Sequence, residues 1–226
     1  MREEKRLPVT FEEVRKSEEI KVYIERADQS LRAIGFTEHS FAHVMKCAVT
    51  ASGLLQKLGY SERECDLVKI AGYMHDIGNV INRCDHAQSG AIMAFRILDK
   101  MGMPVEDIAL VITAIGNHDE GTAFPVNAVA AALILADKTD VRRTRVRNSD
   151  LATFDIHDRV NFAVEESETI FDAEEKTFTL KLRIDTSICA VMDYFEIFLN
   201  RMLLCRKAAE FLGLVFKLEI NGLVLL

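Results

Sequence analysis

Apolar residues recur at helical spacing, at i, i+3, i+4 and i+7, over most of the first two thirds of the chain. Ser61 and Glu64 have the spacing of a capping box, and the helix that follows them is expected to stop at Gly78. Caps, glycines and prolines predict the other helices of this region over residues 11–35, 40–58, 87–101, 105–117 and 126–138.

The pattern changes in the last third of the chain. Residues 176–184 alternate between apolar and polar, which is typical of a half-buried strand, and Asn221-Gly222 between two apolar runs predicts a hairpin. Between them, Thr186 to Leu212 has the pattern of one long amphipathic helix that ends at Gly213. The predicted fold class is therefore mainly α, with a helical domain over residues 1–150 and a small C-terminal α+β module of antiparallel strands over residues 151–226.

Length and composition indicate a globular chain. With 226 residues, 49% hydrophobic and 28% charged, it fits one compact domain or one domain with a small appendage. The net charge of −7 gives no overall electrostatic footprint for a nucleic-acid polymer, so the basic run at residues 142–147 needs a local explanation.

The cysteines and the N-terminal segment bear on localisation. The five cysteines form no CxxC pair and leave an odd one over, which favours a reducing compartment over a disulfide framework. The N-terminal segment lacks the apolar centre of a signal peptide, and the longest apolar run is too short to span a membrane. We therefore expect a cytoplasmic protein without a membrane partner.

Four histidines and two aspartates are the residues most suited to form a functional site in this chain. Imidazole and carboxylate groups suit divalent transition metals, and six such ligands are too many for one tetrahedral centre. Two metals that share the carboxylate of Asp76 would be the economical arrangement. The candidate metal ligands are His43, His75, Asp76, His86, His118 and Asp137.

The local sequences around these residues are "HVMKCA", "GYMHDIG", "CDHAQSG", "IGNHDE" and "LILADKTD". In order and context they resemble the HD-domain metal-dependent phosphohydrolases, in the subgroup that carries extra histidines for a second metal. The resemblance covers roughly residues 35–145. It implies an HD-domain helical bundle that cleaves a phosphate ester, as a phosphohydrolase or phosphodiesterase, by means of a hydroxide that bridges two metals. Asp76 would be catalytic as the shared ligand.

The same resemblance implies two divalent transition metal ions as cofactors. Iron and manganese are favoured, and magnesium, nickel, cobalt and zinc remain open. Each ligating imidazole needs its second nitrogen anchored, and Asp85, Asp119 and Glu120 beside the ligands are candidates for that role.

His39 competes with His43, four residues away on the same helical face. The run "HSFAHV" resembles the sequence in cyclic-nucleotide phosphodiesterases in which the second histidine binds metal and the first donates a proton. The resemblance thus makes His39 either a catalytic general acid or a residue that only supports the ligands. His157 lies beyond the matching region and is expected at an ordinary surface position.

Lys138, Arg142 and Arg143 follow the last candidate ligand, and guanidinium groups bind phosphate through paired hydrogen bonds. We expect these three residues to bind a substrate phosphate, although a solvated charged loop explains the arginine run equally well. Asn79 stands where related phosphohydrolases have the lysine of HDIGK, and the GYP signature of cyclic-di-GMP phosphodiesterases is missing. The expected substrate is a nucleotide or another small phosphorylated metabolite, not a nucleic-acid polymer.

Two other functions remain open. HD-fold oxygenases such as myo-inositol oxygenase hold a mixed-valence di-iron pair on a similar ligand set, and the missing lysine makes this alternative less remote. The domain could also be a metal-stabilised, non-catalytic interaction or dimerisation module. The bare apolar residues at the end of "FKLEINGLVLL" favour a partner for the C-terminal strands, and we expect a homodimer.

Overall fold

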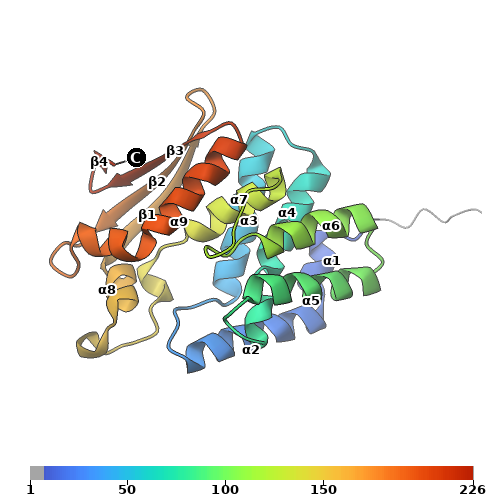
Figure 1. The fold of residues 1–226 in the computed structure, drawn as a ribbon, viewed down its shortest axis with the longest axis horizontal. Coiled ribbons are helices and arrows are strands. Elements are labelled where there is room, and N and C mark those ends of the chain that lie inside the picture. The colour runs from blue at the N-terminus through green and yellow to red at the C-terminus, as the bar shows by residue number, and fades with distance from the viewer. Residues whose placement is uncertain (1–7, 226) are drawn as a thin grey trace, which may run out of the picture.

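The computed structural model describes residues 8–225 (Figure 1). Helices make up the first two thirds, and a four-stranded sheet lies in the last third. The helices are α1 Phe11–Lys16, α2 Glu18–Ala33, α3 Phe41–Lys57, α4 Glu62–Met74, α5 His86–Lys100, α6 Val105–Gly116, α7 Ala128–Lys138, α8 Ile156–Ala163 and α9 Val191–Phe211. The strands are β1 Val164–Asp172, β2 Thr177–Ile184, β3 Val215–Ile220 and β4 Leu223–Val224, and short 3₁₀ turns are η1 Ile77–Val80, η2 Arg143–Arg145 and η3 Leu151–Thr153.

The fold class predicted from the sequence is confirmed, and most of the expected helices form close to their expected bounds. The Ser61–Glu64 capping box is present at the start of α4. The single helix expected over residues 11–35 is wrong. Ser17 ends α1 in an extended conformation, and its side chain accepts a hydrogen bond from the backbone N–H of Ile20, which caps the start of α2.

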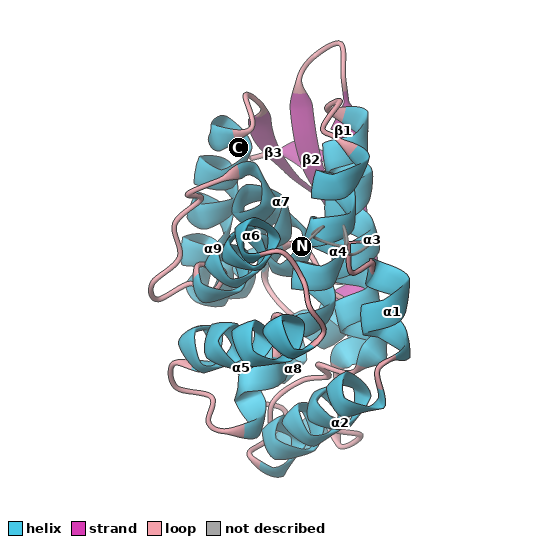
Figure 2. Ribbon diagram, turned by 90° about the vertical axis from the view of Figure 1, so that its right-hand side faces the viewer, coloured by secondary structure: helices cyan, strands magenta, loops and turns pink. Residues whose placement is uncertain are grey.

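Helix α7 is the centre of the molecule. Every residue from Val129 to Lys138 is buried, as the apolar run that ends at Ala136 requires for most of the helix. It packs against α3, α4 and α6 of the bundle and against α9 of the C-terminal part (Figures 1 and 2). The last turn of α7, which ends the apolar run with Asp137 and Lys138, is thereby placed inside the protein.

The sheet has the strand order β1-β2-β3-β4. The expected antiparallel pairing holds for β1 with β2 and for β3 with β4. Strands β2 and β3 run parallel instead, because α9 returns the chain to the end of the sheet at which β2 begins. The hairpin predicted at Asn221-Gly222 joins β3 to β4, and both residues have positive φ angles, 52° and 83°.

Helix α9 links the sheet to the bundle. It packs on β3 and on α7, and its buried side chains Tyr194, Phe198 and Met202 belong to the same apolar core as the bundle helices. It begins five residues later than the sequence pattern predicts, and it ends at Gly213 as expected, with a φ of 72°. The described part of the chain contains no helix with the length and apolarity that a membrane crossing needs.

Gly78 brings η1 against the start of α5. A Cβ atom at this position would lie 2.0 Å from the backbone oxygen of His86 and 2.5 Å from the backbone nitrogen of Gly90. No side chain fits there, so glycine is required for the close approach. Gly78 was expected to end the preceding helix. That helix ends at Met74 instead, and Gly78 sets the distance between the residues after α4 and the first residue of α5.

Candidate metal centre and adjoining cavity

His75 and Asp76 lie where α4 ends. His75 is the C-cap of the helix, and Asp76 is the residue before η1; both are buried. The other four predicted ligands are buried too, although they come from different elements: His43 from the first turn of α3, His86 from the start of α5, His118 from the segment after α6 and Asp137 from the end of α7. The fold brings all six together.

The first group of ligand atoms comes from His43, His75, Asp76 and Asp137. Nε2 of His43 lies 3.3 Å from Oδ1 of Asp137 and 3.7 Å from Oδ2 of Asp76. Nε2 of His75 lies 3.2 Å from the same Asp76 oxygen and 3.9 Å from Oδ1 of Asp137. Two atoms that each bind one ion at about 2.1 Å are roughly 3.0–3.4 Å apart. The group therefore has nearly the spacing of one coordination sphere.

The second group is the pair His86 and His118. Their Nε2 atoms are 3.2 Å apart, and they lie 3.5 Å and 3.9 Å from Oδ1 of Asp76. The two oxygens of Asp76 are thus divided: Oδ2 faces the first group and Oδ1 faces the pair. This is the geometry that a shared carboxylate between two cations requires.

The second ring nitrogen of each of the four histidines has its own acceptor. Nδ1 of His75, His86 and His118 lies 2.8, 3.0 and 2.6 Å from a backbone oxygen three residues earlier in the chain. A ring whose Nδ1–H donates to a carbonyl keeps the lone pair of Nε2 for a metal. The expectation that Asp85, Asp119 and Glu120 would anchor these nitrogens is wrong, because the local backbone supplies the acceptors.

Asp140 anchors the fourth histidine, and the sequence analysis did not single it out. Its Oδ2 lies 2.8 Å from Nδ1 of His43, and the carboxylate also contacts Lys46 and Arg142. Burial alone would raise the pKa of Asp140, but the hydrogen bond to His43 and the charges of Arg145 and Arg142 hold it well below its ordinary value. The carboxylate three residues after Asp137 in "LADKTD" was the signal that could have identified it.

The electrostatics of the centre fit a cation. In the part of the chain that the structure describes, Nε2 of His75 and Oδ2 of Asp76 are buried without a hydrogen-bond partner. Burial lowers the pKa of His75, yet the charges of Asp76 and Asp137 outweigh this and raise it. The site thus attracts positive charge. Nitrogen and carboxylate donors in this arrangement suit a divalent transition metal.

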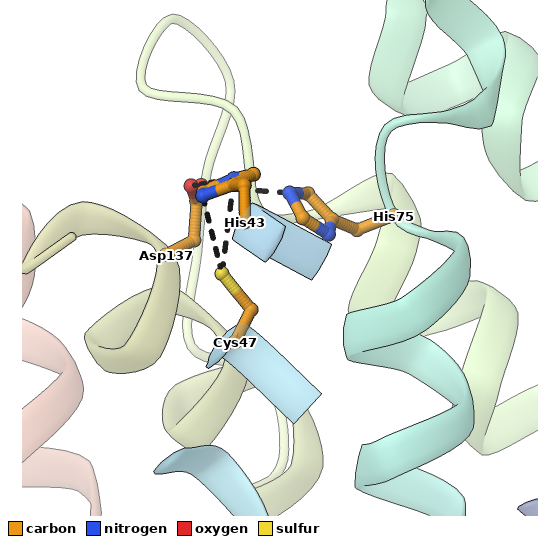
Figure 3. Close-up of side chains that lie close together, drawn as sticks. All are labelled: His43, Cys47, His75 and Asp137. Carbon is orange, nitrogen blue, oxygen red and sulfur yellow. Dashed lines mark hydrogen bonds and ion pairs between the residues drawn. The ribbon is translucent and has the colours of Figure 1, made fainter. Parts of the chain in front are cut away.

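Cys47 lies one turn below His43 and close to Asp137 (Figure 3). Its sulfur is 3.7 Å from both ring nitrogens of His43, so it lies over the face of the ring and away from the direction of the Nε2 lone pair. Burial and the neighbouring carboxylates Asp137 and Asp140 raise the pKa of the thiol. Cys47 therefore packs against the histidine, and its sulfur lies close enough to His43, His75 and Asp137 for the four side chains to share one cation.

This arrangement of histidines and aspartates agrees with the comparison to known families. The family model of the HD domain matches residues 40–162, more than half of the chain. The chain belongs to the HD domain family. It is also similar to the crystal structure of a predicted HD superfamily hydrolase from an uncultured Thermotogales bacterium, with 24% sequence identity and a TM-score of 0.44 over 55% of this chain and 67% of that chain. No curated protein matches the sequence.

A cavity of about 270 Å³ opens from the metal centre of this HD domain, and Asp76, His86, His118 and Asp137 form its inner end. Its other walls include the segment between α2 and α3, one face of α8, and the α9 residues Ile197, Phe198 and Arg201. The charged residues Arg83, Glu120, Lys138 and Arg145 complete the lining. The C-terminal part therefore contributes to the site, whereas the expected domain boundary at residue 150 stays a prediction. No sequence motif indicated this contribution.

Lys138 lines the cavity, as its expected role with substrate requires, but its ammonium group has protein partners. Nζ lies 2.7 Å from Oδ2 of Asp137 and 3.6 Å from Oε1 of Glu120, which also binds Arg201 at 2.6 Å. Burial lowers the pKa of Lys138, and the two carboxylates raise it above its ordinary value. Lys138 thus remains charged and neutralises Asp137.

Arg142 and Arg143, the other two residues expected to bind a substrate phosphate, do not line the cavity. Arg142 forms paired hydrogen bonds with the carboxylate of Asp140. Arg143 donates to the backbone oxygen of Phe162 and lies over the ring of that residue. These contacts hold both guanidinium groups, and Arg145 from the short 3₁₀ turn η2 lines the cavity instead.

His39 also lines the cavity, half-buried, with its ring edge-to-face against His43. Its Nδ1 lies 2.7 Å from the backbone oxygen of Thr37, which leaves Nε2 as an acceptor. Burial and the charge of Arg145 hold the pKa of His39 well below its ordinary value. A neutral imidazole accepts a proton more readily than it donates one. His157 is exposed, as expected, and lies at the α8 wall of the same cavity.

Proposed function

We propose that this HD domain is a metal-dependent phosphohydrolase that cleaves a phosphate ester of a nucleotide or another small phosphorylated metabolite at a two-metal centre. The observation that carries the proposal is the division of the Asp76 carboxylate between the first group of ligands and the His86–His118 pair. Membership of the HD domain family supports it independently. Iron and manganese remain the favoured metals for this mixed nitrogen and oxygen set.

In this proposal His43, His75 and Asp137 would hold one metal, His86 and His118 would hold the other, and Asp76 would be a ligand of both. A metal pair of this kind polarises a phosphoryl oxygen and provides a nucleophile from water at neutral pH. The protein contributes the positions of the ligands. Nδ2 of Asn79, for example, donates to Oδ1 of Asp76 at 2.9 Å and fixes the orientation of the shared carboxylate.

His39 and Lys138 have supporting roles in the proposed reaction. The Nε2 atom of His39 is an acceptor at the cavity wall, so it can orient or deprotonate a water molecule. The low pKa of His39 makes this role better suited to it than the proton-donor role expected from the sequence. Lys138 balances the charge of Asp137 and keeps that ligand ionised.

The proposal is tested with protein purified without chelator. Elemental analysis gives the number of metals per chain, and release of inorganic phosphate from a panel of small phosphate esters gives the activity. We expect two metals per chain and metal-dependent phosphate release. One metal per chain would overturn the two-metal centre. Oxygen consumption without phosphate release would overturn hydrolysis and favour the HD-fold oxygenase instead.

A further inference from the structure

Four cationic side chains line the cavity, and three of them have close protein partners. Lys138 is 2.7 Å from Asp137, and Arg201 is 2.6 Å from Glu120. Arg145 donates to the backbone oxygens of Glu38 and Asp140 at 2.8 and 2.9 Å. Lys138 and Arg201 thus neutralise carboxylates of the cavity wall, and Arg145 holds its backbone in place. Their hydrogen bonds would have to break before any of them could bind a substrate.

Arg83 is different. Its nearest carboxylate, that of Asp119, is 3.9 Å away and partly exposed, so the pair contributes little. Its NH1 group is 3.4 Å from the side-chain oxygen of Asn79, and its guanidinium plane lies over the ring of Phe36 with a separation of 5.4 Å. The aromatic ring and the amide hold the guanidinium at the cavity wall without neutralising it.

Arg83 also lies next to the second group of ligands. Its NH1 group is 3.2 Å from Nε2 of His86. This nitrogen has one lone pair, because Nδ1 of the same ring donates its hydrogen to the backbone oxygen of Arg83. Nε2 cannot both bind a metal and accept from the guanidinium. When His86 serves as a ligand, the NH1 group is therefore left to bind an anion beside the metal.

The α8 wall of the cavity has the opposite charge. Asp155, the N-cap of α8, and Asp158 line it together with Asn161, at three-residue spacing. Oδ1 of Asp155 accepts from the backbone N–H of Asp158, and Oδ2 of Asp158 accepts from Asn148 at 3.3 Å, so each carboxylate has a second oxygen left for a ligand. The Nδ2 group of Asn161 donates to the backbone oxygen of His157, and among the described residues no protein group donates to its amide oxygen. This wall offers acceptors and negative charge, so it favours hydrogen-bond donors and repels a second anionic group.

We propose that Arg83 binds the terminal phosphate of the substrate and that the α8 carboxylates select for a single phosphate. The favoured substrate class is a phosphate monoester whose remaining part is uncharged or carries hydrogen-bond donors. Bisphosphates are disfavoured, because Arg83 is the one available guanidinium among the described residues of the cavity and the α8 carboxylates repel a second phosphate. This inference rests on the proposed function and narrows its substrate class.

The first experiment measures anion binding directly, on the metal-loaded full-length protein. Arg83→Ala should weaken the binding of inorganic phosphate in calorimetry by about 10- to 100-fold, the loss expected for a charge-assisted hydrogen bond. Arg83→Lys should recover part of the affinity, because lysine restores the positive charge but not the paired N–H donors of the planar guanidinium. Arg206→Ala, a surface variant on α9 outside the cavity, is the matched control and should bind phosphate like the wild type.

The second experiment measures selectivity. Fructose 6-phosphate and fructose 1,6-bisphosphate share a sugar and differ in one phosphate, and each is tested as an inhibitor of p-nitrophenyl phosphate hydrolysis. The wild type should bind the monophosphate more tightly. The double variant Asp155→Asn, Asp158→Asn should reduce that preference; asparagine still caps α8, so the helix should remain folded.

The outcomes separate this inference from the proposed function. If the wild type hydrolyses no phosphate ester, the proposed function fails. If it hydrolyses p-nitrophenyl phosphate but Arg83→Ala binds phosphate as tightly as the wild type, with unchanged metal content, the inference about Arg83 is wrong. Equal inhibition by the two fructose phosphates overturns the selectivity.

Discussion

The carboxylate of Asp140 and the imidazole of His43 form a buried hydrogen bond of 2.8 Å between residues 97 positions apart in the chain. Through this bond the segment after α7 orients a ligand on α3. The same carboxylate accepts from Arg142 and contacts Lys46, so its charge is balanced where it lies. Asp140 is therefore a positioning residue for the metal centre and a stabilising residue for the bundle.

We expect Asp140→Asn to weaken metal binding at the first group of ligands. It should also lower the free energy of unfolding by about 3 kcal/mol, because Arg145 and His43 lose a buried charged partner. Metal titration and urea unfolding measure the two effects. The control is Asp107→Asn, which removes the ion pair with Arg63 far from the cavity. An Asp140 variant with unaltered metal affinity would show that His43 does not need this anchor.

The shared position of Asp76 predicts different metal contents for two variants. His118→Ala should retain about one metal per chain, because the first group of ligands is intact. Asp76→Ala should lose most of both metals and all hydrolysis, because each group loses one oxygen of the same carboxylate. Elemental analysis after dialysis decides between these outcomes. Two metals in the His118 variant would contradict the assignment of that residue.

The close approach at Gly78 predicts a large effect from a single methyl group. Gly78→Ala should cost about 1–3 kcal/mol of stability and displace the start of α5, which carries His86. The matched variant is Gly53→Ala in α3, where a Cβ atom meets nothing within 4 Å. That change should stabilise the protein by about 0.5–1 kcal/mol. Thermal unfolding of both variants is the measurement, and equal effects would contradict the argument.

His39→Ala should reduce turnover by about 10²-fold or more while metal content stays the same, if the imidazole accepts a proton in the reaction. His39→Gln keeps a hydrogen-bonding side chain but cannot take up a proton at neutral pH. If both variants are equally slow, proton transfer matters; if glutamine restores the rate, His39 only orients a group by hydrogen bonding. An unchanged rate in His39→Ala would remove the residue from the mechanism altogether.

The homodimer remains a prediction that follows from the exposed edge of the sheet. Leu223 and Val224 of β4 are about two-thirds exposed, and β4 has a sheet neighbour on one side only. Replacing both residues with serine should shift the protein from dimer to monomer in sedimentation experiments. The paired change of Lys217 and Glu219 to serine, within the sheet, is a control that should leave the mass unaltered. A wild-type monomer would refute the prediction.

The six candidate metal ligands could be singled out from the sequence because each occurs in a short, distinctive segment, and the structure brings them together. The partners of these ligands could not. The acceptors for His75, His86 and His118 are backbone oxygens, which leave no mark in the sequence. Asp140 and Arg145 depend on how the segment after α7 turns, and a one-residue rotation there would exchange Arg145 with its neighbours.

Prediction of the sheet from the sequence was limited in the same way. The pattern at residues 176–184 and the turn at Asn221-Gly222 both predict strands, because alternation and turn residues are local properties. Strand β1 was missed, since its outward positions are largely acidic and only Val164 is buried. The parallel pairing of β2 with β3 was missed as well, because it depends on the path of α9 and not on either strand.

The parallel pairing has a mechanical consequence for the cavity. Helix α9 is joined at one end to β2 and at the other to β3, and these strands are paired in register from Thr177 with Val215 to Leu182 with Ile220. The helix cannot slide along its axis without breaking that ladder. Its cavity residues Phe198 and Arg201 thus form a wall whose position the sheet fixes.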